Sequence, residues 1–243
     1  MGISFKYAKR IAKTGTLLLI PLIVIDTAWS FVEFILYNTV FDGTIPFTFD
    51  LIDNITTNLL YTSFACVLAT GMIMLSIYYI KVSRMGLIAS ISLFSFIGVK
   101  VAFIIFRFIQ LMLQYTDTYM ENTFYIFELV TSLLLMAMLI FFDFFQRRLK
   151  SRKNIGYGGS VFPYIFASVG SVYPISSILS LFDVDYVSNI IAFPIMRTLA
   201  FVASIFQILV LFDLLRRFSF MKSFEEAEEE KKIAIPEKKE NEE

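Results

Sequence analysis

The 243-residue sequence contains no histidine and only one cysteine, Cys66. Without histidine the chain cannot build a His-ligated haem site or the usual zinc, copper and iron sites. A single cysteine cannot form an internal disulfide. The patterns G-x-x-x-x-G-K-[ST], G-x-G-x-x-G, H-E-x-x-H and G-x-S-x-G are also absent. We therefore expect no enzymatic activity, no metal ion and no cofactor, so that energy must come from a gradient or a separate ATPase.

Apolar residues, in contrast, are abundant. They make up 57% of the chain, and the mean hydropathy is +0.72, which is typical of a polytopic membrane protein. A spanning helix needs roughly 20 apolar residues, and six stretches qualify: 15–40, 55–80, 86–115, 123–146, 161–182 and 188–215. The predicted fold class is all-α, a multi-pass cell-membrane protein with six transmembrane helices over 15–218. Residues 1–14 form a basic N-terminus, and the charged tail 219–243 is expected to be disordered.

The charges flanking these stretches alternate in sign along the chain. Basic residues precede the first span and follow the second, fourth and sixth, whereas the remaining connections are acidic. The basic residues include Lys6, Lys9, Arg10, Lys81, Arg84, Arg147, Lys150 and Arg216, and the acidic ones include Asp42, Asp50, Asp117, Asp183 and Asp185. Because cytoplasmic connections are enriched in Lys and Arg, this alternation predicts that both termini are cytoplasmic.

Several charged residues lie deep inside the apolar stretches, where a charge is costly unless it is paired or hydrated. They are Asp26, Glu33, Lys100, Arg107, Glu128 and Arg197. Asp26 and Glu33 are seven residues apart, about two helical turns, and so share one face of the first span. Lys100 and Arg107 have the same spacing in the third span. Gln110 and Gln114 extend that second polar stripe outward.

Two interpretations of these charges stay open at this point. In the first, Asp26 pairs with Lys100 and Glu33 with Arg107, because the two ladders match in depth and oppose in sign. Such ion pairs would lock the first span against the third. In the second, the six charges and the two glutamines line a permeation path or an ion-coupled site.

The fifth and sixth stretches carry a different signal. Gly170 and Pro174 lie near the middle of the fifth, which has many small residues, and Pro194 lies three residues before Arg197 in the sixth. Proline and glycine bend or weaken a helix, and transporters place substrate groups at such breaks. We treat these three residues as candidate hinges, with close packing of a central helix as the alternative.

Two further features lie at the predicted cytoplasmic ends. Asp143 precedes Arg147 by four residues, and Asp213 precedes Arg217 by the same spacing. This predicts two pairs, each within one helix, that reach out to the lipid headgroups. The connection 150–160 combines basic residues with glycines. It suits either a flexible loop or a site for lipid or nucleic-acid phosphates.

The chain as a whole, with six spans, charges within them, no ATPase motif and a short charged tail, resembles the polytopic membrane component of the crenarchaeal DNA-import (Ced) system. The resemblance implies an archaeal channel that conducts DNA and is driven by a separate cytosolic ATPase. Lys100, Arg107 and Arg197 would then be candidate phosphate contacts.

Three functional hypotheses follow. The first is a channel-forming or transport subunit of a membrane translocation complex. Its candidate partners are membrane lipid, other small membrane proteins, a separate ATPase, nucleic acid and further copies of the chain. The second is an ion-coupled small-solute transporter acting alone, with Asp26 or Glu33 as the proton or cation carrier. The third is a structural or assembly protein whose charge pairs lock its helices.

Overall fold

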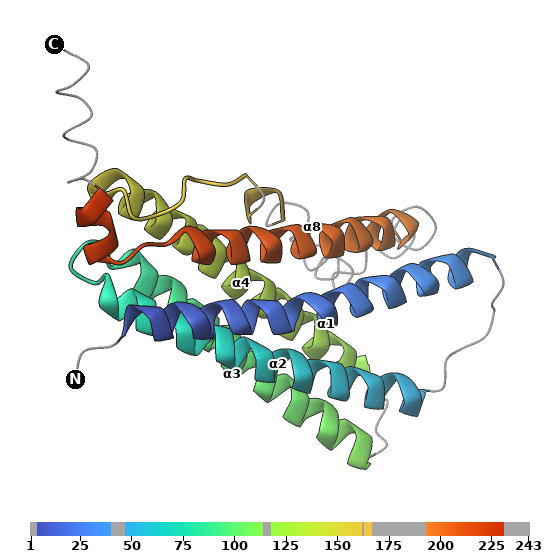
Figure 1. Cartoon of the computed structure of the whole chain (residues 1–243). Coiled ribbons are helices and arrows are strands. Elements are labelled where there is room, and N and C mark those ends of the chain that lie inside the picture. The colour runs from blue at the N-terminus through green and yellow to red at the C-terminus, as the bar shows by residue number, and fades with distance from the viewer. Residues whose placement is uncertain (1–3, 40–46, 114–117, 162, 167–192, 231–243) are drawn as a thin grey trace, which may run out of the picture.

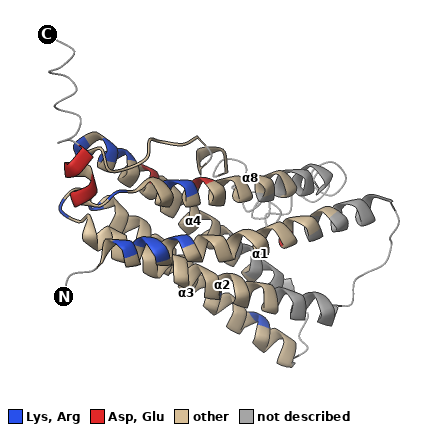
Figure 2. Cartoon of the chain, viewed as in Figure 1, with Lys and Arg blue, Asp and Glu red and all other residues tan. Residues whose placement is uncertain are grey.

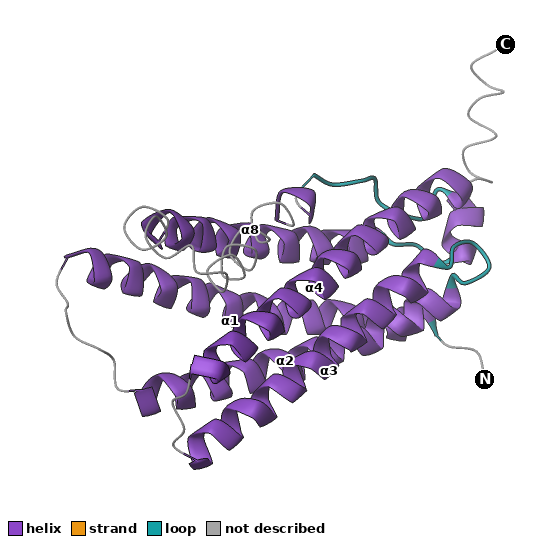
Figure 3. Ribbon diagram, turned by 180° about the vertical axis from the view of Figure 1, so that it is seen from behind, coloured by secondary structure: helices purple, strands orange, loops and turns teal. Residues whose placement is uncertain are grey.

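The chain forms a bundle of long α-helices in the computed structural model, which describes residues 4–39, 47–113, 118–161, 163–166 and 193–230 (Figure 1). The helices are α1 (Phe5–Thr39), α2 (Phe47–Tyr78), α3 (Met85–Leu113), α4 (Thr118–Lys153) and α8 (Phe193–Phe220). Short helical segments cover residues 163–166 and 224–230. No strand occurs in the described part of the chain (Figure 3), so the predicted all-α class is confirmed.

Four of these helices are long and apolar enough to cross a membrane. The apolar stretches are Phe5–Ala28, Ile55–Tyr78, Met85–Met112 and Leu129–Lys153. They support a membrane-embedded protein, as the composition predicts. The fifth predicted span, 161–182, lies mostly outside the described residues, and α8 covers the predicted sixth span from residue 193 onward. The count of six spans and the cytoplasmic position of the termini stay predictions.

Lysine and arginine gather at one end of the bundle, which we call the basic end (Figure 2). This end contains the N-terminus of α1, the turn between α2 and α3, and the C-termini of α4 and α8. We call the adjoining half of the bundle the basic half and the other the opposite half. The connections predicted to lie on one side of the membrane therefore do meet at one end of the fold.

The helices are packed most closely in the basic half. Toward the opposite end, α1 and α8 run side by side and diverge from α2, α3 and α4 (Figures 1 and 3). The most deeply buried described side chains lie mainly in the basic half and include Leu75, Leu93, Phe145 and Phe218, each at most 2% exposed. The core of the described bundle is thus centred near the basic end.

Two glycines allow α1 and α2 to approach each other closely. A Cβ atom added at Gly15 would lie 2.3 Å from the backbone nitrogen of Leu68, and one added at Gly71 would lie 2.2 Å from that of Ala12. Any side chain at either position would force the two backbones apart. Small residues are used in this way where membrane helices pack tightly, and the contact fixes α1 against α2 in the basic half.

The chain beyond α8 folds back over the basic end. Lys9 Nζ donates a hydrogen bond of 2.7 Å to the Met221 carbonyl, and the Phe224 ring stacks on Tyr78 at 5.2 Å between centroids. Ser223 and Glu226 form a capping box: each side chain accepts a hydrogen bond from the other residue's backbone N–H, at 3.1 and 2.8 Å. Residues 221–230 are therefore structured where the sequence predicts disorder, and 231–243 lie outside the described residues.

Candidate functional site

A network of four charged residues connects α4 to α8 near the basic end. Arg147 Nε donates to Asp143 Oδ2 at 2.7 Å, and Arg217 Nε donates to Asp213 Oδ2 at 2.8 Å. Both pairs were predicted from their four-residue spacing and are confirmed. Arg217 Nη2 also lies 2.8 Å from Asp143 Oδ1, an ion-pair contact not aligned for a hydrogen bond, and it joins the two helices. We call these four residues the ion-pair network.

The burial of this network corrects the predicted location of its members. The side chains of Asp143, Arg217 and Asp213 are 0%, 1% and 10% exposed, whereas that of Arg147 is 52% exposed. Of the four, Arg147 alone therefore reaches outward as expected for a headgroup contact. The other three are buried because α4 and α8 face each other here, with the Phe142 and Phe218 rings 5.3 Å apart.

The remaining polar contacts of Asp143 come from the chain after α4. The backbone N–H of Ser160 donates to Asp143 Oδ1 at 3.1 Å, and the Tyr164 hydroxyl donates to Oδ2 at 3.0 Å. A buried carboxylate is tolerated when cations and hydrogen-bond donors replace its water. The ion-pair network therefore holds α4, α8 and the connection after α4 together around one carboxylate.

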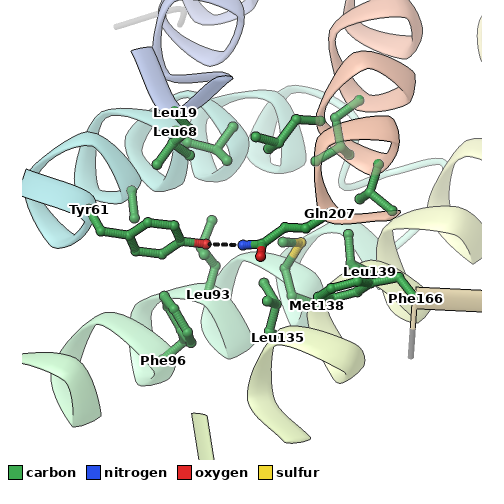
Figure 4. A pocket seen from close by; sticks show the side chains of 14 residues that line it. Leu19, Tyr61, Leu68, Leu93, Phe96, Leu135, Met138, Leu139, Phe166 and Gln207 are labelled. Carbon is green, nitrogen blue, oxygen red and sulfur yellow. Dashed lines mark hydrogen bonds between the residues drawn. The ribbon is translucent and has the colours of Figure 1, made fainter. Parts of the chain in front are cut away.

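A second polar feature lies in the interior of the bundle, between α2 and α8. Gln207 Nε2 donates to the Tyr61 hydroxyl at 3.1 Å, beside a cavity of about 30 Å³ (Figure 4). The cavity is otherwise lined mainly by apolar side chains such as Leu93, Leu135 and Met138. Its volume and its two polar groups suit a water molecule but no larger solute.

Asp26 of α1 belongs to the same region. Its carboxylate is close enough to Tyr61 to act on the phenol electrostatically. The Asp26 side chain is exposed at the surface of this chain, although it lies within an apolar stretch of α1. We call Asp26, Tyr61 and Gln207 the central polar site. It combines an acidic group with two neutral hydrogen-bonding groups from three helices.

The two predicted cations of α3 share one face of that helix, as their spacing indicates. Lys100 Nζ and Arg107 Cζ lie 5.6 and 5.3 Å from the centroid of the Phe103 ring. Lys100 donates to Asn58 Oδ1 on α2 at 3.0 Å, and Arg107 donates to Gln110 Oε1 at 2.9 Å. The hydrogen bond to Asn58 ties α3 to α2. The predicted pairs of Lys100 with Asp26 and of Arg107 with Glu33 stay predictions.

The structure describes the other predicted site residues only in part. Glu33, Glu128, Arg197 and Pro194 lie in α1, α4 and α8, but their side chains fall outside the described set; Gln114, Gly170 and Pro174 lie outside the described residues altogether. Pro194 is the second residue of α8 as described. The roles proposed for these residues stay predictions.

Two features of the structure were not predicted from the sequence, for different reasons. Tyr61 and Gln207 are neutral polar residues within apolar stretches, so a pattern of formal charges does not include them. A search for isolated hydrogen-bonding groups in those stretches would have found both. The cross-helix contact of Arg217 with Asp143 had a weak signal in the pattern Phe-Asp-x-x-x-Arg, which occurs at 142–147 and again at 212–217.

No protein family, curated protein or solved structure matches the chain in the comparisons with known proteins. Among the described residues, no group of three or more His, Cys, Asp or Glu side chains is arranged to hold a metal ion.

Proposed function

We propose that this chain is a transport subunit of a membrane translocation complex. The central polar site is the observation that carries the proposal. A bundle that served only as a scaffold would be most stable with apolar side chains alone in its interior, because an intramembrane polar group is costly. The hydrogen-bonded pair of Tyr61 and Gln207 beside a water-sized cavity, within the electrostatic influence of Asp26, is better suited to a hydrated step in transport.

The size of the cavity favours a complex over a chain that transports large cargo alone. At about 30 Å³, the cavity accommodates water and nothing larger. Cargo as large as DNA, which the resemblance of the sequence implies, would have to pass between this chain and its partners.

The electrostatic influence of Asp26 on Tyr61 favours one alternative function. A carboxylate beside neutral hydrogen-bonding groups and a water-sized cavity is a reasonable carrier of a proton or a cation. In this alternative, the chain is an ion-coupled transporter of a small solute and works without partners.

Reconstitution with and without partners separates the two functions. We would purify the chain from its native membrane and reconstitute it in liposomes, either alone or with the proteins that copurify with it. Uptake of a fluorescent single-stranded oligonucleotide would be measured with and without ATP, and proton flux with an enclosed pH-sensitive dye. Asp26→Asn removes the charge of the central polar site, and Glu225→Gln is the control because Glu225 is exposed at the basic end.

The translocation-complex proposal predicts oligonucleotide uptake that requires both the partners and ATP and that falls at least tenfold in Asp26→Asn but not in Glu225→Gln. Proton flux by the chain alone, abolished by Asp26→Asn, would instead establish the ion-coupled alternative. If folded protein moves neither probe in either preparation, both proposals are wrong and a structural role remains.

A further inference from the structure

The connection after α4 runs back along the helix that it leaves. Asn154 directly follows α4 and has a left-handed backbone conformation, with φ of 54°. After glycine, asparagine is one of the few residues that adopt this conformation at the C-terminus of a helix. The backbone N–H of Tyr157 then donates to Gln146 Oε1 at 3.2 Å, and that of Ser160 donates to Asp143. Residues 154–160, which we call the glycine loop, thus pass from the C-terminus of α4 back along that helix.

Two glycines of this loop lie directly against cations of α4. A Cβ atom added at Gly159 would lie 2.4 Å from Arg147 Cζ, and one added at Gly158 would lie 3.3 Å from Lys150 Nζ. Gly159 and Lys150 are both exposed, as is the side chain of Arg147. The absence of side chains at Gly158 and Gly159 therefore brings the loop backbone and two basic groups together at an accessible surface.

Helix α8 contributes a third cation to the same surface. Arg216 Cζ lies 5.0 Å from the centroid of the Tyr157 ring and 5.8 Å from that of Phe220, and these two rings stack 5.5 Å apart. Within the described part of the chain, neither Lys150 nor Arg216 forms an ion pair. The Arg216 guanidinium is held in place by aromatic rings, so its charge is available to a ligand.

We propose that the glycine loop, with Arg147, Lys150 and Arg216, binds the phosphate headgroup of an anionic membrane lipid. Arginine and lysine are the usual partners of phosphate, arginine through paired hydrogen bonds and lysine as a point charge. Basic groups at the end of membrane helices, next to aromatic rings, lie at the depth of lipid headgroups. This site is separate from the central polar site and does not depend on the transport proposal.

Apolar side chains beside the cations favour a lipid over a soluble phosphate or a nucleic acid. Val161, directly after the loop, is 68% exposed, and Phe220, whose ring contacts Arg216, is 53% exposed. A lipid can cover such residues with its acyl chains while its phosphate contacts the cations. Inorganic phosphate and the nucleic-acid backbone offer the same charge but no acyl chain, so they would leave these side chains uncovered.

The test compares lipid binding by the full chain and by matched variants in mild detergent. We would add equal amounts of phosphatidylglycerol and phosphatidylcholine with identical acyl chains and count the retained lipids by native mass spectrometry. The wild-type chain should prefer phosphatidylglycerol by about thirtyfold or more, the gain expected when two to three basic groups each contribute about 1 kcal/mol near an anionic headgroup. Lys150→Gln with Arg216→Gln should lose this preference. Lys81→Gln with Arg84→Gln removes the same charge from the exposed turn between α2 and α3 and should retain it.

A substitution that leaves the net charge unchanged provides the second arm. Gly159→Ala places a methyl group against the Arg147 guanidinium, which must move away from the loop. Its control is Gly98→Ala, because a Cβ atom at Gly98 meets nothing within 4 Å. We expect Gly159→Ala to lower the preference for phosphatidylglycerol severalfold and Gly98→Ala to leave it unchanged, with equal thermal unfolding midpoints for both variants.

Three results would overturn the proposal. An equal loss of preference in Lys81→Gln with Arg84→Gln would mean that the basic end attracts anionic lipid diffusely, without a site. If the preference for phosphatidylglycerol is unchanged in the single variant Gly159→Ala and also in the double variant Lys150→Gln with Arg216→Gln, the lipid binds elsewhere. Displacement of phosphatidylglycerol by inorganic phosphate or by an oligonucleotide, at constant ionic strength, would assign the surface to a soluble ligand.

Discussion

The basic and opposite halves of the bundle accommodate polar groups in different ways. In the basic half, Asp143 and Arg217 are buried and neutralise each other across two helices. Near the middle of α3, Lys100 donates to the neutral amide of Asn58, and toward the opposite end α3 diverges from α1 and α8 (Figure 1). The number of charges in a span is therefore less informative than how each charge is buried and bonded, because a buried ion pair such as Asp143–Arg217 is part of the packing between two helices.

The largest effect should come from breaking the ion-pair network. Arg217→Gln removes the cation that contacts both Asp143 and Asp213, so the largely buried Asp213 loses its ion pair and Asp143 keeps only the one to Arg147. We expect the free energy of unfolding to fall by about 3 kcal/mol, because removing one partner of a buried pair leaves an uncompensated charge. Thermal unfolding in detergent, followed by circular dichroism, measures the change.

The adjacent residue provides the control for this prediction. Arg216→Gln removes the same charge from the same helix, but its side chain is exposed and forms no ion pair within the described part of the chain. Its effect should stay below about 0.5 kcal/mol, as for most exposed positions. Equal destabilisation by the two substitutions would show that the network contributes no more than a surface charge, and the contrast between the two halves would disappear.

The next largest effect should come from separating α1 and α2 in the basic half. Gly71→Ala places a Cβ atom 2.2 Å from the Ala12 backbone nitrogen, and a backbone cannot move aside as a side chain can. Overpacking of this kind costs about 2 kcal/mol. Gly98→Ala, near the middle of α3, meets no atom within 4 Å and should be neutral or slightly stabilising. If both substitutions prove neutral, the helices in the basic half are not in close contact.

Local spacing was sufficient to predict much of this molecule. The apolar stretches predicted long helices, and the four-residue spacing of Asp143 and Arg147 predicted their hydrogen bond, because both signals depend only on helix geometry. The seven-residue spacing of Lys100 and Arg107 likewise predicted their common face. The alternation of charged connections correctly grouped the basic segments at one end, although it does not establish which side of a membrane that end faces.

Contacts between helices could not be predicted from the sequence. Whether Arg217 reaches Asp143, or Lys100 reaches Asn58, depends on how each helix is rotated and where it crosses its neighbour. The periodicity of one helix carries no such information. The same limit explains the tail: Ser223 and Glu226 had the spacing of a capping box, but the burial of Met221 and Ala227 against the basic end depends on tertiary packing.

The smallest effect should come from the central polar site, where the hydrogen bond joins two neutral groups. Tyr61→Phe removes the hydroxyl that accepts from Gln207 and leaves an amide donor beside a mainly apolar cavity. We expect a loss of about 1 kcal/mol in the free energy of unfolding, about a third of the loss for Arg217→Gln, because a neutral donor is cheaper to leave unpaired than a charge. Unfolding of Tyr61→Phe, of Gln207→Leu and of the double variant completes a double-mutant cycle.

The coupling energy from that cycle distinguishes a dry interior from a hydrated one. If the cavity is dry, the two substitutions should couple by about 1 kcal/mol. Either substitution alone leaves the polar group of the other residue without its hydrogen-bond partner, whereas the double variant removes both groups. If water occupies the cavity, it can replace the lost hydroxyl, and the coupling should fall close to zero. Strong coupling would make Tyr61 and Gln207 a lock like the ion-pair network, whereas weak coupling would support a hydrated centre beside Asp26, which the transport proposal requires.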